Sequence, residues 1–422
     1  MKSASILNRR EFLRRATLAT GALGVAPLVI TGAAASLPPS GRITVGAIGI
    51  RGRGHGLLNV FLQQPDVQVV AVCDVIGNHR RRAKATVDNH YGNEDCTAYI
   101  DMRELLARPD IDAVLIATGD NNHAWCSVLA AQAGKDIFCE KPMGVTAAEG
   151  RAVMDAVRRF GRVYQCGTQR RNLEHFVFAV DLARSGRLGE IETVYAERAY
   201  TSSGVHFKVY EPEPEPAYEE VAWDLWLGPA AWRPYSRRYT QRAGWREHGD
   251  FSGGSITEWG SHTVDLCQWA LDADNTAPIS YEPIENGDVE AKYANGVKLV
   301  ITKGLRMGTC PIRIEGTEGW VGTGDSGEIE TNPPSLAAGR RWAPTVGRSG
   351  GHLREFLDCV KSRRQPRSSA SASHYSMLAC HGANISVRLN RRVDFDPVKE
   401  VFPGDDEATR LLSRTYREPY SI

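Results

Sequence analysis

This sequence has almost no excess of charge of either sign. Lysines and arginines number 51 against 50 aspartates and glutamates, so the formal net charge is +1. A surface that binds nucleic acid or an anionic membrane needs a clear excess of positive charge. We therefore expect no nucleic-acid partner.

Patterned cysteines and metal-ligand motifs are also missing. The nine cysteines include no CxxC pair and no Cys/His ligand spacing, and an odd number without a pattern does not make a disulfide framework. Cys73 and Cys139 end apolar runs and are expected to be buried thiols. No set of His, Asp and Glu has ligand spacing, so no metal is predicted. The remaining composition, 42% hydrophobic and 24% charged, is typical of a soluble globular protein.

One stretch near the N-terminus, residues 16–41, lacks charge altogether. The paired arginines of NRREFLRR (8–15) precede it, and the small residues of TGAAAS offer a cleavage site near Ala35. This arrangement resembles a twin-arginine export signal over residues 1–35. The resemblance implies a periplasmic or otherwise exported protein that uses the twin-arginine export machinery, which carries proteins already folded.

A membrane anchor is the alternative interpretation of the same stretch. The stretch is only weakly hydrophobic because it contains Gly21, Gly24, Pro27 and Gly32. This favours the export signal over the membrane anchor.

Short apolar runs alternate with helical patterns over residues 41–165. The predicted strands are RITVGAIGI (42–50), VQVVAVCDV (67–75), AVLIATG (113–119) and DIFCEKP (136–142). Thr146 and Glu149 form a capping-box pattern at the start of the helix that follows. The alternation predicts an α/β fold with a Rossmann-type, doubly wound parallel sheet.

The pattern changes after about residue 190. Period-two alternation with NG and SG turns predicts a second, α+β domain over residues 166–350, with an open, largely antiparallel sheet. The Pro/Glu-rich stretch 211–220 is predicted to be a surface loop. Two helical stretches and a tail, residues 351–422, are predicted to pack back on both domains.

A glycine-rich turn, in TVGAIGIRGRGHGLLNVF (44–61), follows the first predicted strand. The pattern G-x-G-x-x-G is met only by Gly49 and Gly54, because Arg51 holds the middle glycine position. Such a loop brings backbone N–H groups and a helix N-terminus to the phosphates of a dinucleotide. The residues predicted to contact the cofactor here are Gly49, Ile50, Arg51, Gly52, Arg53 and Gly54.

Asp74 ends the second predicted strand, twenty residues beyond Gly54. A carboxylate at this place hydrogen-bonds the 2′-hydroxyl of the cofactor ribose, which favours NAD over NADP. The arginines at 80–82 offer the alternative, since they can meet a 2′-phosphate.

The segment CEKPMG (139–144) follows a strand of this half-domain. Glu-Lys-Pro at such a strand exit resembles the signature of the glucose–fructose oxidoreductase / inositol dehydrogenase (Gfo/Idh/MocA) family. The resemblance extends to four further segments: IATGDNNHAWCSVLAAQAGKDIF, GRVYQCGTQRR, WDLWLGPAAWRPY and GGSITEWGSHTVDLCQWAL. It implies an oxidoreductase with a Rossmann domain, a tightly held nicotinamide cofactor, a carbohydrate or cyclitol substrate, and a homo-oligomer, either a dimer or a tetramer.

The resemblance also implies roles for three residues. Lys141 lies beside the nicotinamide and the substrate hydroxyl. The family's D-x-G-x-H motif reads Glu258, Gly260 and His262 here, with glutamate in place of aspartate. The i, i+4 spacing places Glu258 and His262 on one helix face. We predict His262 as the acid/base and Glu258 as its partner or a substrate hydrogen-bonder.

Other polar residues near these motifs are weaker candidates, and for each of them a structural role is the alternative. Predicted cofactor contacts are Thr118, Asn121, His123, Glu140 and Gln169. Predicted substrate contacts are Arg170, Trp245, Arg246, Asp250 and Asp265.

Two chemistries suit a cofactor that is carried out of the cell and regenerated in each cycle. The favoured one is oxidation or reduction of a sugar, glycoside or cyclitol hydroxyl. The other is glycoside hydrolysis through oxidation, elimination, hydration and reduction, which needs a further base such as Tyr195, Tyr200 or Tyr210. A binding protein with a vestigial cofactor site is disfavoured because Lys141 and His262 are both present.

Overall fold

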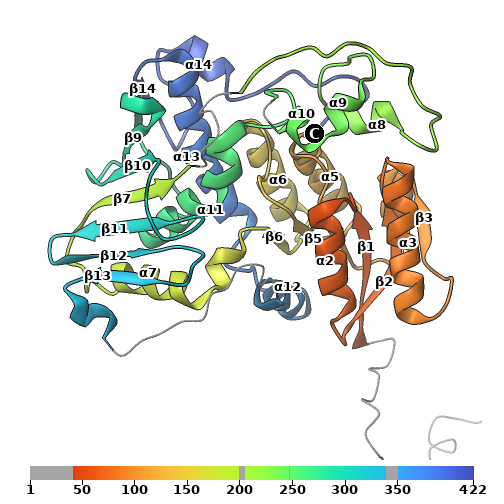
Figure 1. The fold of residues 1–422 in the computed structure, drawn as a ribbon, viewed down its shortest axis with the longest axis horizontal. Coiled ribbons are helices and arrows are strands. Elements are labelled where there is room, and N and C mark those ends of the chain that lie inside the picture. The colour runs from red at the N-terminus through yellow and green to blue at the C-terminus, as the bar shows by residue number, and fades with distance from the viewer. Residues whose placement is uncertain (1–40, 199–204, 247, 339–349) are drawn as a thin grey trace, which may run out of the picture. The chain divides into compact units, whose positions relative to one another are not determined.

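The computed structural model describes residues 41–198, 205–246, 248–338 and 350–422 (Figure 1). The predicted export signal lies outside the described residues. Within the described part of the chain, no helix combines the length and the apolar character needed to cross a membrane.

The first sheet contains six parallel strands in the order β3-β2-β1-β4-β5-β6. Its strands are β1 (Ile43–Ile48), β2 (Val67–Cys73), β3 (Thr97–Tyr99), β4 (Ala113–Ile116), β5 (Asp136–Cys139) and β6 (Tyr164–Cys166). The helices between them are α2 (Gly52–Leu62), α3 (Gly77–Tyr91), α4 (Met102–Leu106), α5 (Asp120–Gln132) and α6 (Ala147–Arg159). This strand order is that of a Rossmann fold, so the predicted fold class is confirmed for this half.

Both faces of this sheet are covered, which explains why its strands are continuous apolar runs. On one face, Phe61 of α2 and Phe356 of α12 (Gly350–Ser362) each pack edge-to-face on Phe138 of β5. On the other face lie α4, α5 and α6, whose apolar residues belong to a second buried cluster. The capping box predicted for α6 is present, with Thr146 and Glu149 bonded reciprocally.

Strands β1 and β4 are neighbours at the centre of the sheet, although two other strands separate them in sequence. The chain therefore proceeds outward in opposite directions from this pair. In open α/β sheets, ligands bind at such a reversal, beyond the carboxyl ends of the strands.

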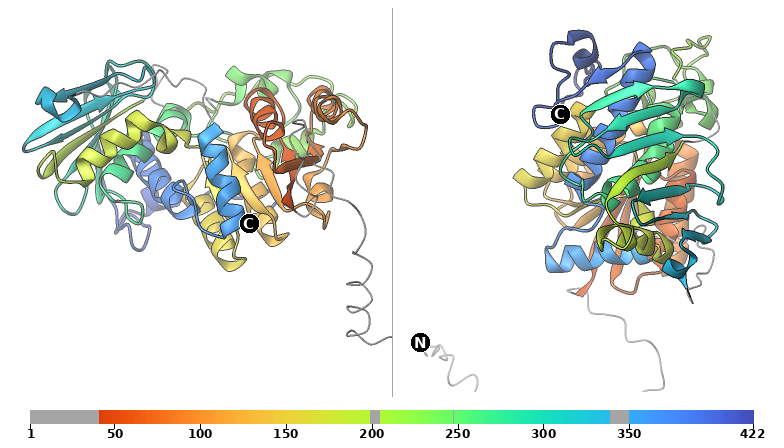
Figure 2. Two further views of the ribbon diagram at one scale, coloured as in Figure 1. Left: turned by 90° about the horizontal axis from the view of Figure 1, so that it is seen from below. Right: turned by 90° about the vertical axis from the view of Figure 1, so that its left-hand side faces the viewer.

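The second sheet has eight strands in the order β13-β12-β11-β7-β10-β9-β8-β14 (Figure 2). They are β7 (Ile191–Glu197), β8 (Ser280–Pro283), β9 (Val289–Lys292), β10 (Lys298–Thr302), β11 (Ile312–Gly316), β12 (Gly319–Thr323), β13 (Ile329–Asn332) and β14 (Val393–Asp394). All neighbouring pairs are antiparallel except β7 and β10. The predicted largely antiparallel sheet is thus confirmed, with one parallel pair that a long crossover makes possible.

Helices cover one face of the second sheet and connect it to the first. α11 (Gly254–Ala270) packs on β7, and α7 (Glu174–Arg184) packs on β12. α13 (Ala370–Leu389) packs between α11, β8 and α6, and α14 (Asp406–Arg410) follows it. The 351–422 segment therefore contacts both sheets, through α12 on the first and α13 on the second.

Between β7 and α11 the chain makes a long excursion, residues 205–246 and 248–253, which we call the strap. It contains three short helices, α8 (Trp223–Leu227), α9 (Arg237–Thr240) and α10 (Arg242–Trp245). It has a small aromatic core of its own, made of Trp223, Leu227, Ala230, Tyr235, Tyr239 and Phe251.

The predicted loop 211–220 lies in the first half of the strap and is largely exposed. Its end is tied to the turn after β2 by two backbone bonds, Gly77 N to Glu220 O (2.9 Å) and Ala222 N to Val75 O (3.0 Å). The strap therefore passes beside the carboxyl end of β2 at residues 220–222.

Candidate active site

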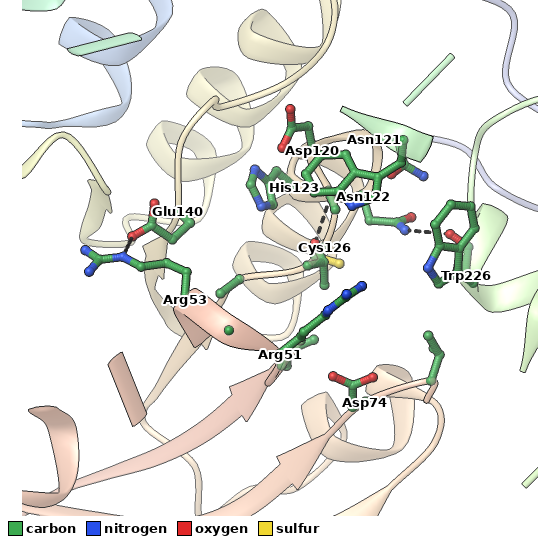
Figure 3. A pocket seen from close by; sticks show the side chains of 18 of the residues that line it. Arg51, Arg53, Asp74, Asp120, Asn121, Asn122, His123, Cys126, Glu140 and Trp226 are labelled. Atoms are coloured by element: carbon green, nitrogen blue, oxygen red, sulfur yellow. Dashed lines mark hydrogen bonds and ion pairs between the residues drawn. The ribbon is translucent and has the colours of Figure 1, made fainter. Parts of the chain in front are cut away.

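A cavity of about 790 Å³ opens at the carboxyl ends of β1, β2, β4 and β5 (Figure 3). The glycine-rich turn, the first turn of α5, the 3₁₀ turn Gln169–Asn172, the strap and α11 complete its walls. The cavity thus lies at the chain reversal, where the fold predicts a ligand.

The glycine-rich turn needs glycine at two of its positions. Gly49 has φ +78°, and a Cβ there would lie 2.5 Å from the backbone N of Thr118. A Cβ on Gly54 would lie 2.1 Å from the carbonyl O of Gly49, so this glycine lets α2 approach the turn. Gly54 and Ile50 serve this packing and do not line the cavity, unlike the other loop residues predicted as cofactor contacts.

Arg51, which replaces the middle glycine, is accommodated because its backbone is extended at the N-cap of α2. Its guanidinium group extends into the cavity (Figure 3) and donates to the carbonyl O of Thr240 in the strap. Arg53 pairs with Glu140, Nε to Oε1 at 2.7 Å.

Asp74 is 6% exposed at the end of β2 and lines the cavity. Its Oδ2 accepts a hydrogen bond from the backbone N of Ile50 (2.7 Å), and its Oδ1 accepts one from that of Ile76 (2.8 Å). These bonds fix the carboxylate, and each oxygen keeps a lone pair for a ligand hydroxyl.

The arginines at 80–82 are not placed to contact a 2′-phosphate in the cavity. Arg80 is buried and donates to the carbonyl oxygens of Asp74 and Glu219, both at 2.7 Å. Arg81 forms an ion pair with Glu220 (2.8 Å), and Arg82 is exposed. None of the three lines the cavity.

Lys141 and Glu258 meet at the far end of the cavity from Asp74. The Nζ of Lys141 donates to Oε2 of Glu258 (3.2 Å) and to its carbonyl O (3.1 Å). Arg246 of the strap approaches the same Oε2 at 3.1 Å. Glu258 therefore holds Lys141. Its predicted roles, as the partner of His262 or as a substrate hydrogen-bonder, stay predictions.

His262 lines the cavity one helical turn beyond Glu258 on α11. Its Nδ1 is buried and has no hydrogen-bond partner among the described residues. Burial, followed by the positive charges of Arg170 and Lys141, lowers the pKa of His262 well below its usual value. The imidazole is therefore neutral at neutral pH and able to accept a proton.

Asp120, the first residue of α5, was missed in the sequence. It is 2% exposed, lines the cavity and interacts with Glu258. Burial and the negative charge of Glu258 raise the pKa of Asp120 well above its usual value. Burial alone would raise the pKa of Glu258 too, but the charges of Lys141 and Arg246 lower it. Asp120 is thus the protonated member of the pair and Glu258 the ionised one.

The signal that could have revealed Asp120 is its position directly after a buried strand, at the edge where the other site residues gather. Strap residues such as Trp226 and Thr240 also line the cavity, and no pattern in the sequence predicted that they would.

Two predicted cofactor contacts on α5 have structural partners. The Nδ2 of Asn121 donates to the carbonyl O of Leu227 in the strap (3.0 Å). The Nδ1 of His123 donates to the carbonyl O of Pro142 (2.7 Å), and burial lowers its pKa. Both residues line the cavity, as do Thr118, Glu140 and Gln169.

Two predicted substrate contacts lie elsewhere. Asp265 is 1% exposed and accepts hydrogen bonds from Nε (2.7 Å) and NH2 (2.8 Å) of the buried Arg171. Three residues beyond His262, it is rotated by about 60° around the helix and leaves the cavity face. The carboxylate of Asp250 pairs with Arg233. Arg170, Trp245 and Arg246 do line the cavity.

The residues present fit a dinucleotide. Phosphates suit the N-terminus of α2 beside Arg51, and ribose hydroxyls suit Asp74. Several residues that line the cavity carry buried side-chain atoms without a partner among the described residues: Asp120 Oδ2, His123 Nε2, Gln169 Oε1, Arg170 NH1, Arg246 Nε, Glu258 Oε1 and His262 Nδ1. Buried polar atoms are nearly always hydrogen-bonded, so the cavity is built for a polar ligand. The described residues contain no group of three or more His, Cys, Asp or Glu able to hold a metal ion.

Comparisons with known proteins agree with this architecture. The chain is 31% identical over 181 residues to inositol 2-dehydrogenase of Salmonella typhimurium, which covers 43% of this chain and 52% of the relative. The chain thus spans about half the length of the curated relatives it matches. Its fold is similar to that of myo-inositol 2-dehydrogenase from Lactobacillus plantarum, with a TM-score of 0.59 and 17% identity over 84% of this chain and all of that one. GenD2 from gentamicin A biosynthesis, solved with NAD, gives a TM-score of 0.59 and 20% identity over 84% and 97% of the two chains.

Two family models match most of the chain. Residues 43–168 match the oxidoreductase family's NAD-binding Rossmann fold, and residues 199–422 match the C-terminal alpha/beta domain of the same family. The chain belongs to the Gfo/Idh/MocA oxidoreductase family.

Proposed function

We propose that the protein is an exported oxidoreductase that transfers hydride between a retained NAD and a hydroxyl of a sugar, glycoside or cyclitol. The observation that carries this proposal is the cluster of Lys141, Glu258 and His262 at one end of the cavity, opposite Asp74. The inositol dehydrogenases among its relatives support a polyhydroxylated substrate.

The roles of the three residues follow from their contacts. Lys141, held by Glu258, is positioned to donate a hydrogen bond to the substrate oxygen. His262, neutral because of its lowered pKa, accepts the hydroxyl proton as the C–H bond breaks. The nicotinamide, when bound, takes up the hydride.

NAD is favoured over NADP because of Asp74 and of the arginines that follow it. A carboxylate repels a 2′-phosphate and hydrogen-bonds a 2′-hydroxyl. Arg80 and Arg81, which a 2′-phosphate would need, are engaged with the strap.

Retention of the cofactor is supported by the strap. It contacts the turn after β2, Arg51 of the glycine-rich turn, and the first turn of α5 through Asn121 and Asn122. A bound dinucleotide would lie beneath these contacts. Since an exported enzyme meets no free NAD, retention and export belong to one proposal.

The two described tyrosines that were candidates for the elimination base do not favour the alternative hydrolase. Of the tyrosines considered as a base for elimination, Tyr195 donates to Glu315 (3.3 Å) and Tyr210 packs on Tyr239. Tyr200 lies outside the described residues. Neither Tyr195 nor Tyr210 lines the cavity.

The test uses protein purified without added cofactor and a panel of sugars, glycosides and cyclitols, followed by mass spectrometry. The expected product is two mass units lighter than the substrate, formed at about one per enzyme or together with a reduced second sugar. Release of an aglycone without net redox change would replace the proposal by the hydrolase.

A further inference from the structure

The substrate end of the cavity has more fixed positive than negative charge. Lys141, Arg170 and Arg246 line it, and Glu258 is the ionised acid in contact with two of them. Asp120 adds no charge because its raised pKa keeps it protonated. Asp325 pairs with Arg170 from outside the lining.

Asp325 holds the guanidinium group of Arg170 in a position that leaves one of its nitrogens without a hydrogen-bond partner among the described residues. Its Nε and NH2 donate to the two carboxylate oxygens of Asp325, at 2.9 and 2.5 Å. Thr309 donates to the same carboxylate (2.6 Å) and fixes it in turn. The remaining nitrogen, NH1, is buried without a partner among the described residues, in a side chain that is 10% exposed as a whole.

Arg246 of the strap presents a second unused donor in the same cavity. Its NH1 contacts Glu258, and its guanidinium carbon lies 5.2 Å from the ring centroid of Trp245. Its Nε is buried and has no partner among the described residues.

Arg170 is buried, whereas the Arg246 side chain is 34% exposed, but each holds one buried donor without a partner among the described residues. Such donors call for an anionic acceptor. A buried donor without a partner costs about 1–3 kcal/mol, and more when it is charged. Carboxylates match the planar fork of arginine better than neutral hydroxyls do. The cofactor phosphates do not meet this need, because their place is at the N-terminus of α2. Arg170 and His262 line the same cavity, and the positive charge of Arg170 helps to lower the pKa of His262.

We propose that the substrate is a sugar acid, such as an aldonate or a uronate, whose carboxylate is bound by Arg170 and Arg246. This inference rests on the proposed function and names its substrate class. The secondary alcohol of the acid loses its hydroxyl proton to His262 and its carbinol hydride to NAD⁺, which gives a keto acid, NADH and protonated His262. The carboxylate itself is unchanged and fixes which hydroxyl faces Lys141.

The experiment compares matched pairs, glucuronate with glucose and gluconate with glucitol, on the intact protein with its bound cofactor. Turnover is followed by NADH fluorescence. Binding is measured by calorimetry on protein loaded with NADH, where oxidation is blocked. We expect the acid of at least one pair to exceed its neutral partner by about 100-fold in kcat/KM and to bind more tightly.

Arg246→Met should remove most of this preference, whereas Arg238→Met, an exposed cation of the same strap, should keep it. Arg170→Lys, which retains the charge opposite Asp325, should raise KM for the acid more than it lowers kcat. Cofactor fluorescence in each variant reports whether the site has folded.

The two proposals fail in different ways. Equal or tighter binding of every neutral partner overturns the sugar-acid inference, whatever turnover shows. Tighter binding of an acid without reduction of NAD supports the inference and contradicts the proposed hydride transfer.

Discussion

At the scale of single residues, the charge state of His262 decides when it can act as a base. Burial, Arg170 and Lys141 all lower its pKa, so its neutral form persists to lower pH than in a free histidine. A base must be neutral to accept a proton, and its activity is lost as the pH falls through its pKa.

The acidic limb of kcat/KM is therefore expected below pH 6.5, the usual pKa of histidine. The measurement is kcat/KM of the holoenzyme from neutral pH downward, with His262→Asn as the control that loses the limb and most of the rate. An acidic limb with its midpoint at or above pH 6.5 would mean that His262 is not the base, or that nearby negative charges compensate the positive charges around it.

The pKa of Asp120 is shifted in the opposite direction from that of His262. Its folded-state pKa is raised, so the folded protein keeps the proton that the unfolded chain loses above the usual carboxyl pKa. The wild type therefore loses stability as the pH rises from about 4 toward the folded-state pKa of Asp120.

Asp120→Asn imitates the protonated carboxyl and has no such loss. Its stability relative to the wild type is expected to increase between pH 5 and pH 8, while activity at neutral pH is largely kept. Urea denaturation at both pH values and one rate measurement test this. A variant that is inactive at neutral pH would show that Asp120 acts as a carboxylate.

The residue scale also separates what the sequence could predict from what it could not. Gly49 and Asp74 were predictable because a local turn or strand end defines each of them, whereas Lys141 was predicted only through the family resemblance of CEKPMG. Asp120 and Asp265 were not, because the first depends on contact with distant Glu258 and the second on a buried arginine from another segment.

At the scale of elements, the regular sheets were predictable and the strap was not. Buried parallel strands and alternating antiparallel ones each have a periodicity that the sequence shows. The strap helices α8, α9 and α10 have four or five residues each, too few for a helical pattern. The strap is held by backbone carbonyls, such as those of Thr240 and Leu227, which no side-chain pattern reveals.

The bond from Arg51 to the strap gives a prediction about cofactor retention. A guanidinium with several donors can contact the strap and the cofactor phosphates together. Arg51→Ala is expected to speed NAD release by about tenfold, the lower range for one charge-assisted hydrogen bond. The rate is measured by the fluorescence change when the holoenzyme is diluted with a competing scavenger.

Arg81→Ala is the matched control for this prediction. Arg81 also ties the strap to the first sheet, through Glu220, but both side chains are more than half exposed. Exposed ion pairs contribute little free energy to holding two segments together, so NAD release from Arg81→Ala should remain near the wild-type rate. Equal acceleration in both variants would mean that the strap acts as a whole and that Arg51 has no special part.

At the scale of the whole molecule, the C-terminal segment links the parts that form the site. α12 completes the core on one face of the first sheet, and α13 packs between the two sheets. The sequence predicted this return of the chain from two amphipathic stretches, without showing its attachment points. The predicted oligomer stays a prediction, since it concerns further copies of the chain.

Arg414 attaches the C-terminal tail to three other elements near the site. It donates to Oε1 of Glu149 (2.7 Å) in α6, to the carbonyl O of Asn121 (2.9 Å) in α5, and to that of Asp250 (2.8 Å) in the strap. Glu149 is 1% exposed and also caps α6, so loss of Arg414 would leave a buried carboxylate with an uncompensated charge.

Arg414→Met should therefore lower the free energy of unfolding by about 3–5 kcal/mol, the cost of breaking a buried ion pair from one side. Arg184→Met removes an exposed pair with Asp272 and should cost about 0–1 kcal/mol. Urea denaturation of both variants gives the comparison, and cofactor retention in the absence of urea gives a second readout. If Arg414→Met were as stable as Arg184→Met yet released NAD faster, the tail would control the strap without stabilising the fold. If both properties were unchanged, the tail contacts would have no energetic role, and the site would depend on the two sheets and the strap alone.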